Sequence, residues 1–518
     1  MTHKRISLTV RAMRRVAPTW IACTISLMIV LASLLTYVPY AQTTPISCEY
    51  WVAPPPAGNN VYPGTFDQPW ATLDYASARV LALGGDSCTV WFKDGIYIGQ
   101  QDLNERFLTP TTFKAIHPYK AIMQSGGLVL NLSGTKNMIF DGFEFRHPGP
   151  GVGELVVYVS HKGAFWSEYV TFRNNIFHDS YNNDLLKIYD GARFITFEGN
   201  VFYNQGAFEQ HMDINSVTDI TIQDNIFFND YPGSGRSNIN QTKSFIVIKD
   251  SNDNTDGLEG SERITIRRNI FLNWEGGRES FIQAGIDGKP FYEAKDVRVE
   301  NNLMIGNALN DMSAAFGVAG AKNVTFINNT VVGDLPSYAY ACNVSIKDLN
   351  PINQDIFFYN NIWSDPTGTM GANLYGVTNE FSDGNPAQTN NLILDNNLYW
   401  NGGAVIPPGD LVSPLIDDAR RVVADPFLQT DQSNIIFPRW TGSAFLSGNL
   451  TIRQEFVRLV GLYGQTPPGS PAIGKADLTL APAEDILGRP RDATPDMGAF
   501  EYNSPPGTNQ SYLPLIAR

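Results

Sequence analysis

Charged residues are scarce in this chain. They make up 17% of its 518 residues, against about 25% in an ordinary soluble protein. That scarcity excludes a charged coiled coil, and an aromatic content of 12% excludes a mainly disordered chain. The net charge is -14, and because residues 1–41 contain basic side chains and no acid, the rest of the chain is more acidic still. Nucleic acid is therefore not expected as a partner, since phosphate contacts need clustered Lys and Arg.

Cysteine is also rare, with four residues in the whole chain, too few for a disulfide scaffold. Cys23 lies in the N-terminal basic and apolar segment, whereas Cys48 and Cys88 lie in strand-like runs near the start of the body. In an oxidising compartment a Cys48–Cys88 bridge is favoured over two buried free thiols. Cys342 is then expected to be unpaired and buried.

Long hydrophobic runs are absent except at the N-terminus. There, a basic stretch through Arg15 precedes an uncharged run over 16–37 and then a polar segment, which is the layout of a secretory signal. The run is longer than the usual apolar region of about 7–15 residues, so an uncleaved membrane anchor is the alternative. Both interpretations predict an extracellular or cell-surface body, attached to a membrane only through this segment if it is not cleaved.

The sequence is rich in one repeated phrase, in which apolar and polar residues alternate, turn at Asn and resume with a short apolar run. The first copies, VTFRNNIF (170–177), ITFEGNVF (195–202) and ITIQDNIF (220–227), are 25 residues apart, and later intervals are longer. A period of 25 residues accommodates three short strands with their turns, and period-two alternation argues against helical repeats. Asn suits the turn because it tolerates left-handed backbone angles. The aligned asparagines are Asn175, Asn200, Asn225, Asn269, Asn302, Asn329, Asn361 and Asn397.

On these phrases the stretch from Met138 to Tyr399 resembles the pectate-lyase-like right-handed parallel β-helix superfamily. Phrases at 50–78, 470–476, 485–492 and 495–502 resemble the opening and closing segments of secreted and surface-anchored β-helix proteins. The resemblance implies an all-β fold, a right-handed parallel β-helix with an N-terminal cap and an irregular C-terminal segment. Within that segment the residues IRQEFVRLVGLY (452–463) predict a short amphipathic helix. The expected parts are a signal or anchor (1–41), a cap with the first coils (42–136), the repeats (137–400), a closing segment (401–502) and a tail (503–518).

Chemistry is expected on an outer strand face, where polar side chains of successive coils align. Aligning Ile188 with Ile214 as inward residues places Lys187 beside Asp213 and Leu185 beside His211, about 4.8 Å apart. Lys187, Asp213 and His211 are then predicted to point outward and to transfer protons. The alternative is a surface Lys–Asp pair of little energetic consequence.

The resemblance implies a polysaccharide partner and a Lys or Arg base acting on uronic acids, often with calcium. On that resemblance Lys187 is the base and His211 or Arg193 its helper, with Asp213 in the same catalytic group. The chain as a whole is expected to be a monomer. Side chains expected to extend the substrate groove are Asp184, Tyr189, Lys249 and Arg278.

A second cluster, DSNDNTDG over 250–257, is rich in carboxylates and amides. Because calcium takes six to eight oxygen ligands, Asp250, Asp253 and Asp256 are the candidate calcium ligands, against the alternative of a solvated polar loop. The loop does not follow the EF-hand pattern, since Thr255 stands at the Gly position and Ser261 at the final Glu position.

Two further functions stay open beside a polysaccharide lyase. A glycoside hydrolase needs two facing carboxylates about 5–9.5 Å apart, and Asp184, Glu209 and Asp213 lie on neighbouring predicted coils. A non-catalytic, adhesive surface protein that binds glycans has the same fold, because a fold does not determine a function.

Overall fold

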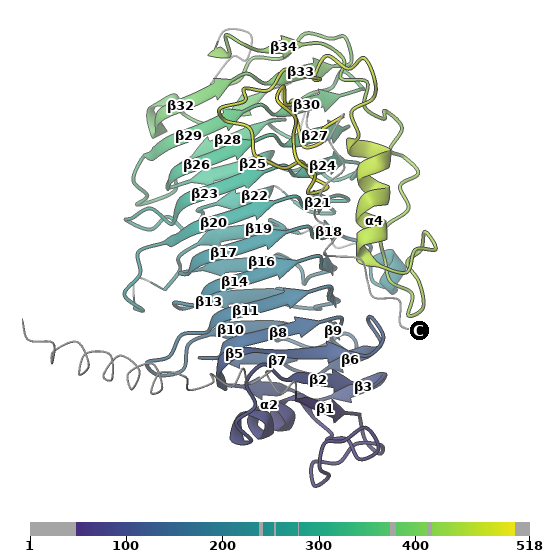
Figure 1. Cartoon of the computed structure of the whole chain (residues 1–518). Helices are drawn as coiled ribbons and strands as arrows, with labels where there is room; N and C mark the ends of the chain where they lie inside the picture. Colours follow the sequence, from purple (N-terminus) through teal and green to yellow (C-terminus); the bar gives the residue numbers. More distant parts are fainter. Residues whose placement is uncertain are drawn as a thin grey trace, which may run out of the picture. The chain divides into compact units, whose positions relative to one another are not determined.

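The computed structural model describes residues 48–502 apart from 238–241, 253–254, 278, 373–379 and 412–416. The predicted signal or anchor and the predicted tail lie outside these residues. The described chain winds into stacked coils, and each complete coil gives one strand to each of three parallel sheets, which we call A, B and C (Figure 1). This arrangement confirms the predicted right-handed parallel β-helix.

The strands of each sheet run in the order of the coils. Sheet A contains β1 (Glu49–Val52), β2 (Thr89–Phe92), β5 (Arg106–Ala115), β8 (Lys136–Asp141), β11 (Glu168–Arg173), β14 (Arg193–Glu198), β17 (Thr218–Gln223), β20 (Ser261–Arg267), β23 (Ala294–Glu300), β26 (Ala321–Ile327), β29 (Asn353–Tyr359) and β32 (Thr389–Asp395). Sheet B contains β3 (Gly95–Ile98), β6 (Ala121–Gln124), β9 (Glu144–Arg146), β12 (Ile176–His178), β15 (Val201–Tyr203), β18 (Ile226–Phe228), β21 (Ile270–Phe271), β24 (Leu303–Gly306), β27 (Thr330–Gly333), β30 (Ile362–Asp365), β33 (Leu398–Asn401) and β34 (Val422–Val423). Sheet C contains β4 (Gln101–Leu103), β7 (Leu130–Ser133), β10 (Val157–Ser160), β13 (Leu186–Tyr189), β16 (Met212–Asn215), β19 (Ile246–Lys249), β22 (Ser280–Ala284), β25 (Ala314–Ala319), β28 (Cys342–Ser345) and β31 (Ser382–Asp383).

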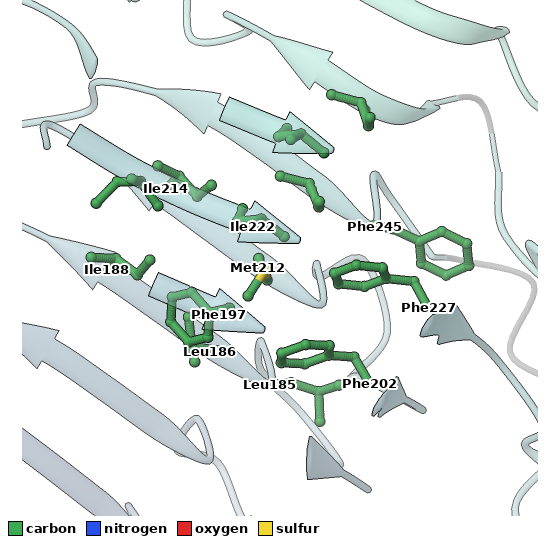
Figure 2. Packing of buried hydrophobic residues seen from close by; sticks show 14 of the residues in the cluster. Leu185, Leu186, Ile188, Phe197, Phe202, Met212, Ile214, Ile222, Phe227 and Phe245 are labelled. Atoms are coloured by element: carbon green, nitrogen blue, oxygen red, sulfur yellow. The ribbon is translucent and has the colours of Figure 1, made fainter. Parts of the chain in front are cut away.

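Like residues stack on like inside the coil. Phe140, Phe172 and Phe197 of sheet A form a column with 5.1 Å between successive ring centroids. Phe202 and Phe227 stack in the same way, and the aliphatic residues of sheet C face them across the core (Figure 2). Parallel strands place equivalent residues about 4.8 Å apart, so a repeated sequence gives columns of identical side chains, whose burial is the main favourable contribution to folding.

The repeated Asn residues form a buried ladder at the turn between sheets A and B. Asn225 shows the pattern: its backbone N–H and its Nδ2 both donate to Oδ1 of Asn269, each at 3.0 Å. Its Nδ2 also donates to the carbonyl of Phe197, and its own Oδ1 accepts from Asn200. All eight predicted asparagines are fully buried, so the alignment is confirmed. The last rung is Asp418, a buried carboxylate that accepts from Asn397 and Tyr399.

The first coils are covered by α2 (Leu73–Ala82), which buries Leu73, Ala76 and Val80 in the main core. Cys48 and Cys88 form a disulfide, and Cys342 is a buried free thiol, as predicted from the cysteine positions. None of the helices formed by the described residues is both long and apolar enough to cross a membrane.

The segment after β34 returns along the outer face of sheet B instead of covering only the last coil (Figure 1). Its helix, α4 (Ile452–Leu459), continues into the π-helical turn η3 (Val460–Gly464), which confirms the helix predicted near 452–463. A capping box of Thr451 and Gln454 begins α4. Short 3-10 turns occur at η1 (Pro232–Ser234) and η2 (Pro386–Gln388).

Candidate functional site

Charged side chains gather on the outer face of sheet C, across β13, β16 and β19. The register pairs Lys187 with Asp213 and Ile188 with Ile214, as the sequence predicts. Asp213 Oδ2 lies 3.0 Å from Lys187 Nζ and 3.6 Å from Lys249 Nζ. Lys249 Nζ is in turn 3.8 Å from Asp287 Oδ2. We call these four residues, together with Asp184 and Glu209, the sheet C cluster.

Asp213 is the centre of this cluster and is only 2% exposed. Its Oδ2 is held between two ammonium groups, whereas its Oδ1 has no hydrogen-bond partner among the described residues. Leaving a buried polar atom without a partner costs about 1–3 kcal/mol. Each such atom in a folded protein needs an explanation, and a catalytic role is one of those known.

The lysines of the cluster are held in their charged form. Burial by itself lowers the pKa of Lys187, but the negative charge of Asp213 and its hydrogen bond outweigh burial and raise that pKa above its ordinary value. Burial also lowers the pKa of Lys249, and Asp213 and Asp287 together raise it. Two fixed positive charges therefore lie on the same face of sheet C, where they can bind a carboxylate.

The remaining acids of the cluster are held towards their protonated form. Burial, followed by the charges of Asp213 and Glu209, raises the pKa of Asp184 well above its ordinary value. Burial and the charge of Asp213 likewise raise the pKa of Glu209. A carboxylic acid that keeps its proton can act as a general acid.

An aromatic side chain lies beside Lys187. Lys187 Nζ is 5.0 Å from the ring centroid of Tyr189, and that ring stacks on Tyr158 of the preceding coil. Such rings add an apolar, hydrogen-bonding wall of the kind that sugar-binding surfaces use.

The prediction that His211 points outward is wrong. Strand β13 begins at Leu186, so the alternation does not extend back to Leu185, and both Leu185 and His211 are buried. The His211 ring packs on Phe245 at 4.5 Å, and its Nε2 is 3.1 Å from Asn229 Oδ1. Burial lowers the pKa of His211 to about 3, so it is an uncharged core residue and not a helper on the outer face.

Arg193 is likewise placed away from the cluster. It lies at the start of β14 in sheet A, where its Nη2 is 3.0 Å from Glu168 Oε2 and its guanidinium lies over the ring of Trp166. Glu168 also pairs with Arg106 and Lys136, so Arg193 belongs to a separate ion network. Arg278 lies outside the described residues.

The predicted calcium loop over 250–257 uses its carboxylates internally. Asp250 accepts from the backbone N–H groups of Asn252 and Gly260, and Asp256 accepts from Ser216 and Leu258. Asp253 lies outside the described residues. Among those described, three acids whose oxygens lie within 4.8 Å of one another occur only at Glu380, Asp383 and Asp410. In its described part, the 250–257 loop therefore does not fit a calcium site.

Asp287 is the member of the cluster that sequence reasoning missed. It follows β22 in an irregular connection where no repeat aligns it with Lys249, so no pattern in the sequence pointed to it. Tyr158 was missed as well, although it stands one rung before Lys187 in the same register and alignment of β10 with β13 would have found it.

This chain is similar to known proteins in its three-dimensional structure. No protein family model and no curated protein matches the chain. Pectate lyase Pel9A superposes with a TM-score of 0.50 at 14% identity, over 88% of this chain and 97% of that chain. A mannuronic acid specific polysaccharide family 6 lyase from human gut microbiota has a TM-score of 0.42 at 12% identity, over 70% of this chain and 82% of its own. PfbA, a surface adhesin of Streptococcus pneumoniae, has a TM-score of 0.34 at 12% identity, over 63% of this chain and 85% of its own. At these identities the similarity shows the fold.

Proposed function

We propose that this chain, which has the fold of the pectate-lyase-like right-handed parallel β-helices, cleaves uronic-acid-containing polysaccharides by β-elimination at the sheet C cluster. The observation that carries the proposal is the arrangement of Lys187, Asp213 and Lys249 on adjacent rungs, with a buried carboxylate oxygen that lacks a partner among the described residues. We further propose that the protein works outside the cell as a monomer.

In the proposed reaction the uronate carboxylate binds the ammonium group of Lys249. This contact neutralises the carboxylate and acidifies the adjacent C5 proton. Lys187, once it has lost its own proton, takes the C5 proton. The electron pair left at C5 forms the C4=C5 double bond while the C4–O bond breaks, and the departing oxygen takes a proton from water.

Calcium has no step in this proposal. A calcium ion on the outer face would have to share Asp213 with two lysines that already lie 3.0 and 3.6 Å from it, and like charges repel at such distances. We therefore expect the product to form at the same rate in a calcium chelator as in added calcium.

The test follows the ultraviolet absorbance of the unsaturated product on a panel of uronans, each with chelator and with calcium. Lys187→Ala should lower the rate by at least about 100-fold, the effect of losing a general base. Lys322→Ala is the matched control, because Lys322 lies exposed on sheet A in β26. Absence of product from every uronan under both conditions would refute the elimination.

Hydrolysis is the second candidate, and the raised pKa values of Asp184 and Glu209 beside Asp213 favour it. A hydrolase would release reducing ends without the ultraviolet absorbance and would lose activity in Glu209→Gln while tolerating Lys187→Ala. A protein that binds uronans and releases neither product is the adhesive alternative.

A further inference from the structure

From β8 to β32, each strand of sheet A contains one residue with a left-handed backbone, at its second or third position. Asn, Asp or Arg occupies this position in most coils, at Asn137, Asp219, Arg263, Asp296, Asn323, Asp355 and Asn391. In two neighbouring coils it is instead an aromatic residue, Tyr169 (φ 57°) in β11 and Phe194 (φ 55°) in β14. Asn and Asp tolerate this conformation, whereas bulky side chains rarely adopt it.

These two aromatic residues gain little from the fold. A left-handed backbone costs about 1–2 kcal/mol for a residue with a side chain, and the two remain 47% and 39% exposed. Their rings stack on each other, with centroids 4.7 Å apart and planes 7° from parallel. That contact is worth about 0.5–1.5 kcal/mol, which is less than the strain of the two residues together. Exposed apolar side chains that stability does not require commonly mark a binding surface.

The stacked rings form one side of a groove of about 630 Å³. Its floor is a row of threonines on successive rungs, Thr171, Thr196, Thr221 and Thr265. Each is partly exposed, and each hydroxyl can donate and accept a hydrogen bond. The strands β11, β14, β17 and β20 that build the groove lie side by side in Figure 1.

The groove is electrically neutral. Its lining contains one acid and one base, Asp219 and Arg263. These form a bidentate ion pair, with Arg263 Nε 2.8 Å from Asp219 Oδ1 and Nη2 2.9 Å from Oδ2. The groove thus differs from the sheet C cluster, where the two lysines face outward. The backbone groups of the floor are bonded within the sheet, so a peptide strand would find no free edge there.

We propose that this groove is a second glycan-binding site, specific for uncharged polysaccharide chains. The faces of sugar rings pack on Tyr169 and Phe194, and sugar hydroxyls bond to the threonine row. The site is independent of the sheet C cluster and of the reaction proposed for it, because it lies on a different sheet and shares no residue with that cluster.

The test is a binding assay with the full chain on insoluble neutral polysaccharides, namely cellulose, xylan and mannan, with polygalacturonate as the charged comparison. The variant is the double substitution Tyr169→Asn with Phe194→Asn, because Asn occupies this position in other coils. Its melting temperature should be equal to or higher than that of the wild type. Its affinity for the neutral polymer bound by the wild type should fall about tenfold or more, while binding to polygalacturonate stays the same.

The matched control is Phe427→Asn. Phe427 is 55% exposed and also has a left-handed backbone (φ 58°), but it lies outside the groove. Three results would overturn the proposal: a wild type that binds none of the three neutral polymers, a double variant that binds as well as the wild type, or an equal loss in Phe427→Asn. Failure of the elimination assay would leave the proposal standing, since neither assay uses the residues of the other.

Discussion

At the scale of single residues, the Lys187–Asp213 pair makes activity depend on pH in a direction that can be tested. The charge of Asp213 raises the pKa of Lys187 against the effect of burial, so a lysine base is released only in alkaline solution. We expect kcat/KM on a uronan to rise with pH through the alkaline range. In Asp213→Asn burial still lowers the pKa of Lys187 and the raising charge is gone, so the midpoint of the rise should move to lower pH.

Asp287→Asn serves as the control for that shift. Asp287 contacts Lys249 at 3.8 Å and competes with the uronate carboxylate for it, so its loss should raise the affinity for uronan while the midpoint of the alkaline rise moves much less. If the midpoint of the rise of kcat/KM with pH is the same in Asp213→Asn as in the wild type, the group that titrates is not Lys187.

The same residues show what a sequence can predict at this scale. Period-two alternation was sufficient to align Lys187 with Asp213, because both lie inside regular strands. The alternation failed at His211, which precedes its strand by one residue and turns into the core. It could not find Asp287, because that side chain reaches the cluster from an irregular connection and its position follows from packing.

At the scale of the turn between sheets A and B, the Asn ladder is both the best-predicted element and the easiest to test. Asn225→Ala removes the donor to Phe197 and leaves the buried donors of Asn200 without their acceptor. A loss of about 3 kcal/mol in the free energy of unfolding is expected, measured by chemical denaturation. Asn390→Ala is the control: Asn390 is exposed in β32 and is not among the residues with a left-handed backbone, so the change should alter stability by less than about 0.5 kcal/mol.

The end of the ladder explains one departure from the repeat. Every internal rung must accept from the coil before it and donate to the coil after it, which an amide can do. Asp418 has only donors around it, from the backbone N–H groups of Asn396 and Asn397, from Asn397 Nδ2 and from the Tyr399 hydroxyl. A carboxylate, which only accepts, therefore suits the last rung.

At the scale of the whole molecule, the coils follow from local repetition, whereas the return of the C-terminal segment along sheet B does not. The backbone N–H of Ile452 donates to the hydroxyl of Tyr119, 333 positions away in the sequence. Trp440 packs on the same ring at 5.0 Å, and Arg439 Nε is 2.7 Å from Asp230 Oδ2. Contacts between such distant segments leave no periodic signal, which is why the sequence predicted α4 and not its place.

A buried ion network beneath this segment makes the stability of the folded body depend on pH. His178 is 3.2 Å from Glu144 and 2.8 Å from Asp179. Burial lowers the pKa of His178, but hydrogen bonds to the two carboxylates outweigh it and raise the pKa from 6.5 to about 9. A group whose pKa is raised on folding stabilises the protein fully below its unfolded pKa, and that stabilisation disappears as the pH rises through the folded pKa. The melting temperature should therefore fall between about pH 6.5 and 9, where up to about 3 kcal/mol is lost.

Two histidine variants separate this effect from general changes in charge. His178→Gln should be less stable than the wild type at pH 6.5 and should lose most of the slope of melting temperature against pH. His117→Gln is the control, because His117 pairs with Asp94 on the surface with its side chain 67% exposed, where an ion pair is worth little; it should keep the wild-type slope. A wild type whose melting temperature stays constant between pH 6.5 and 9 would show that His178 is uncharged in the folded protein.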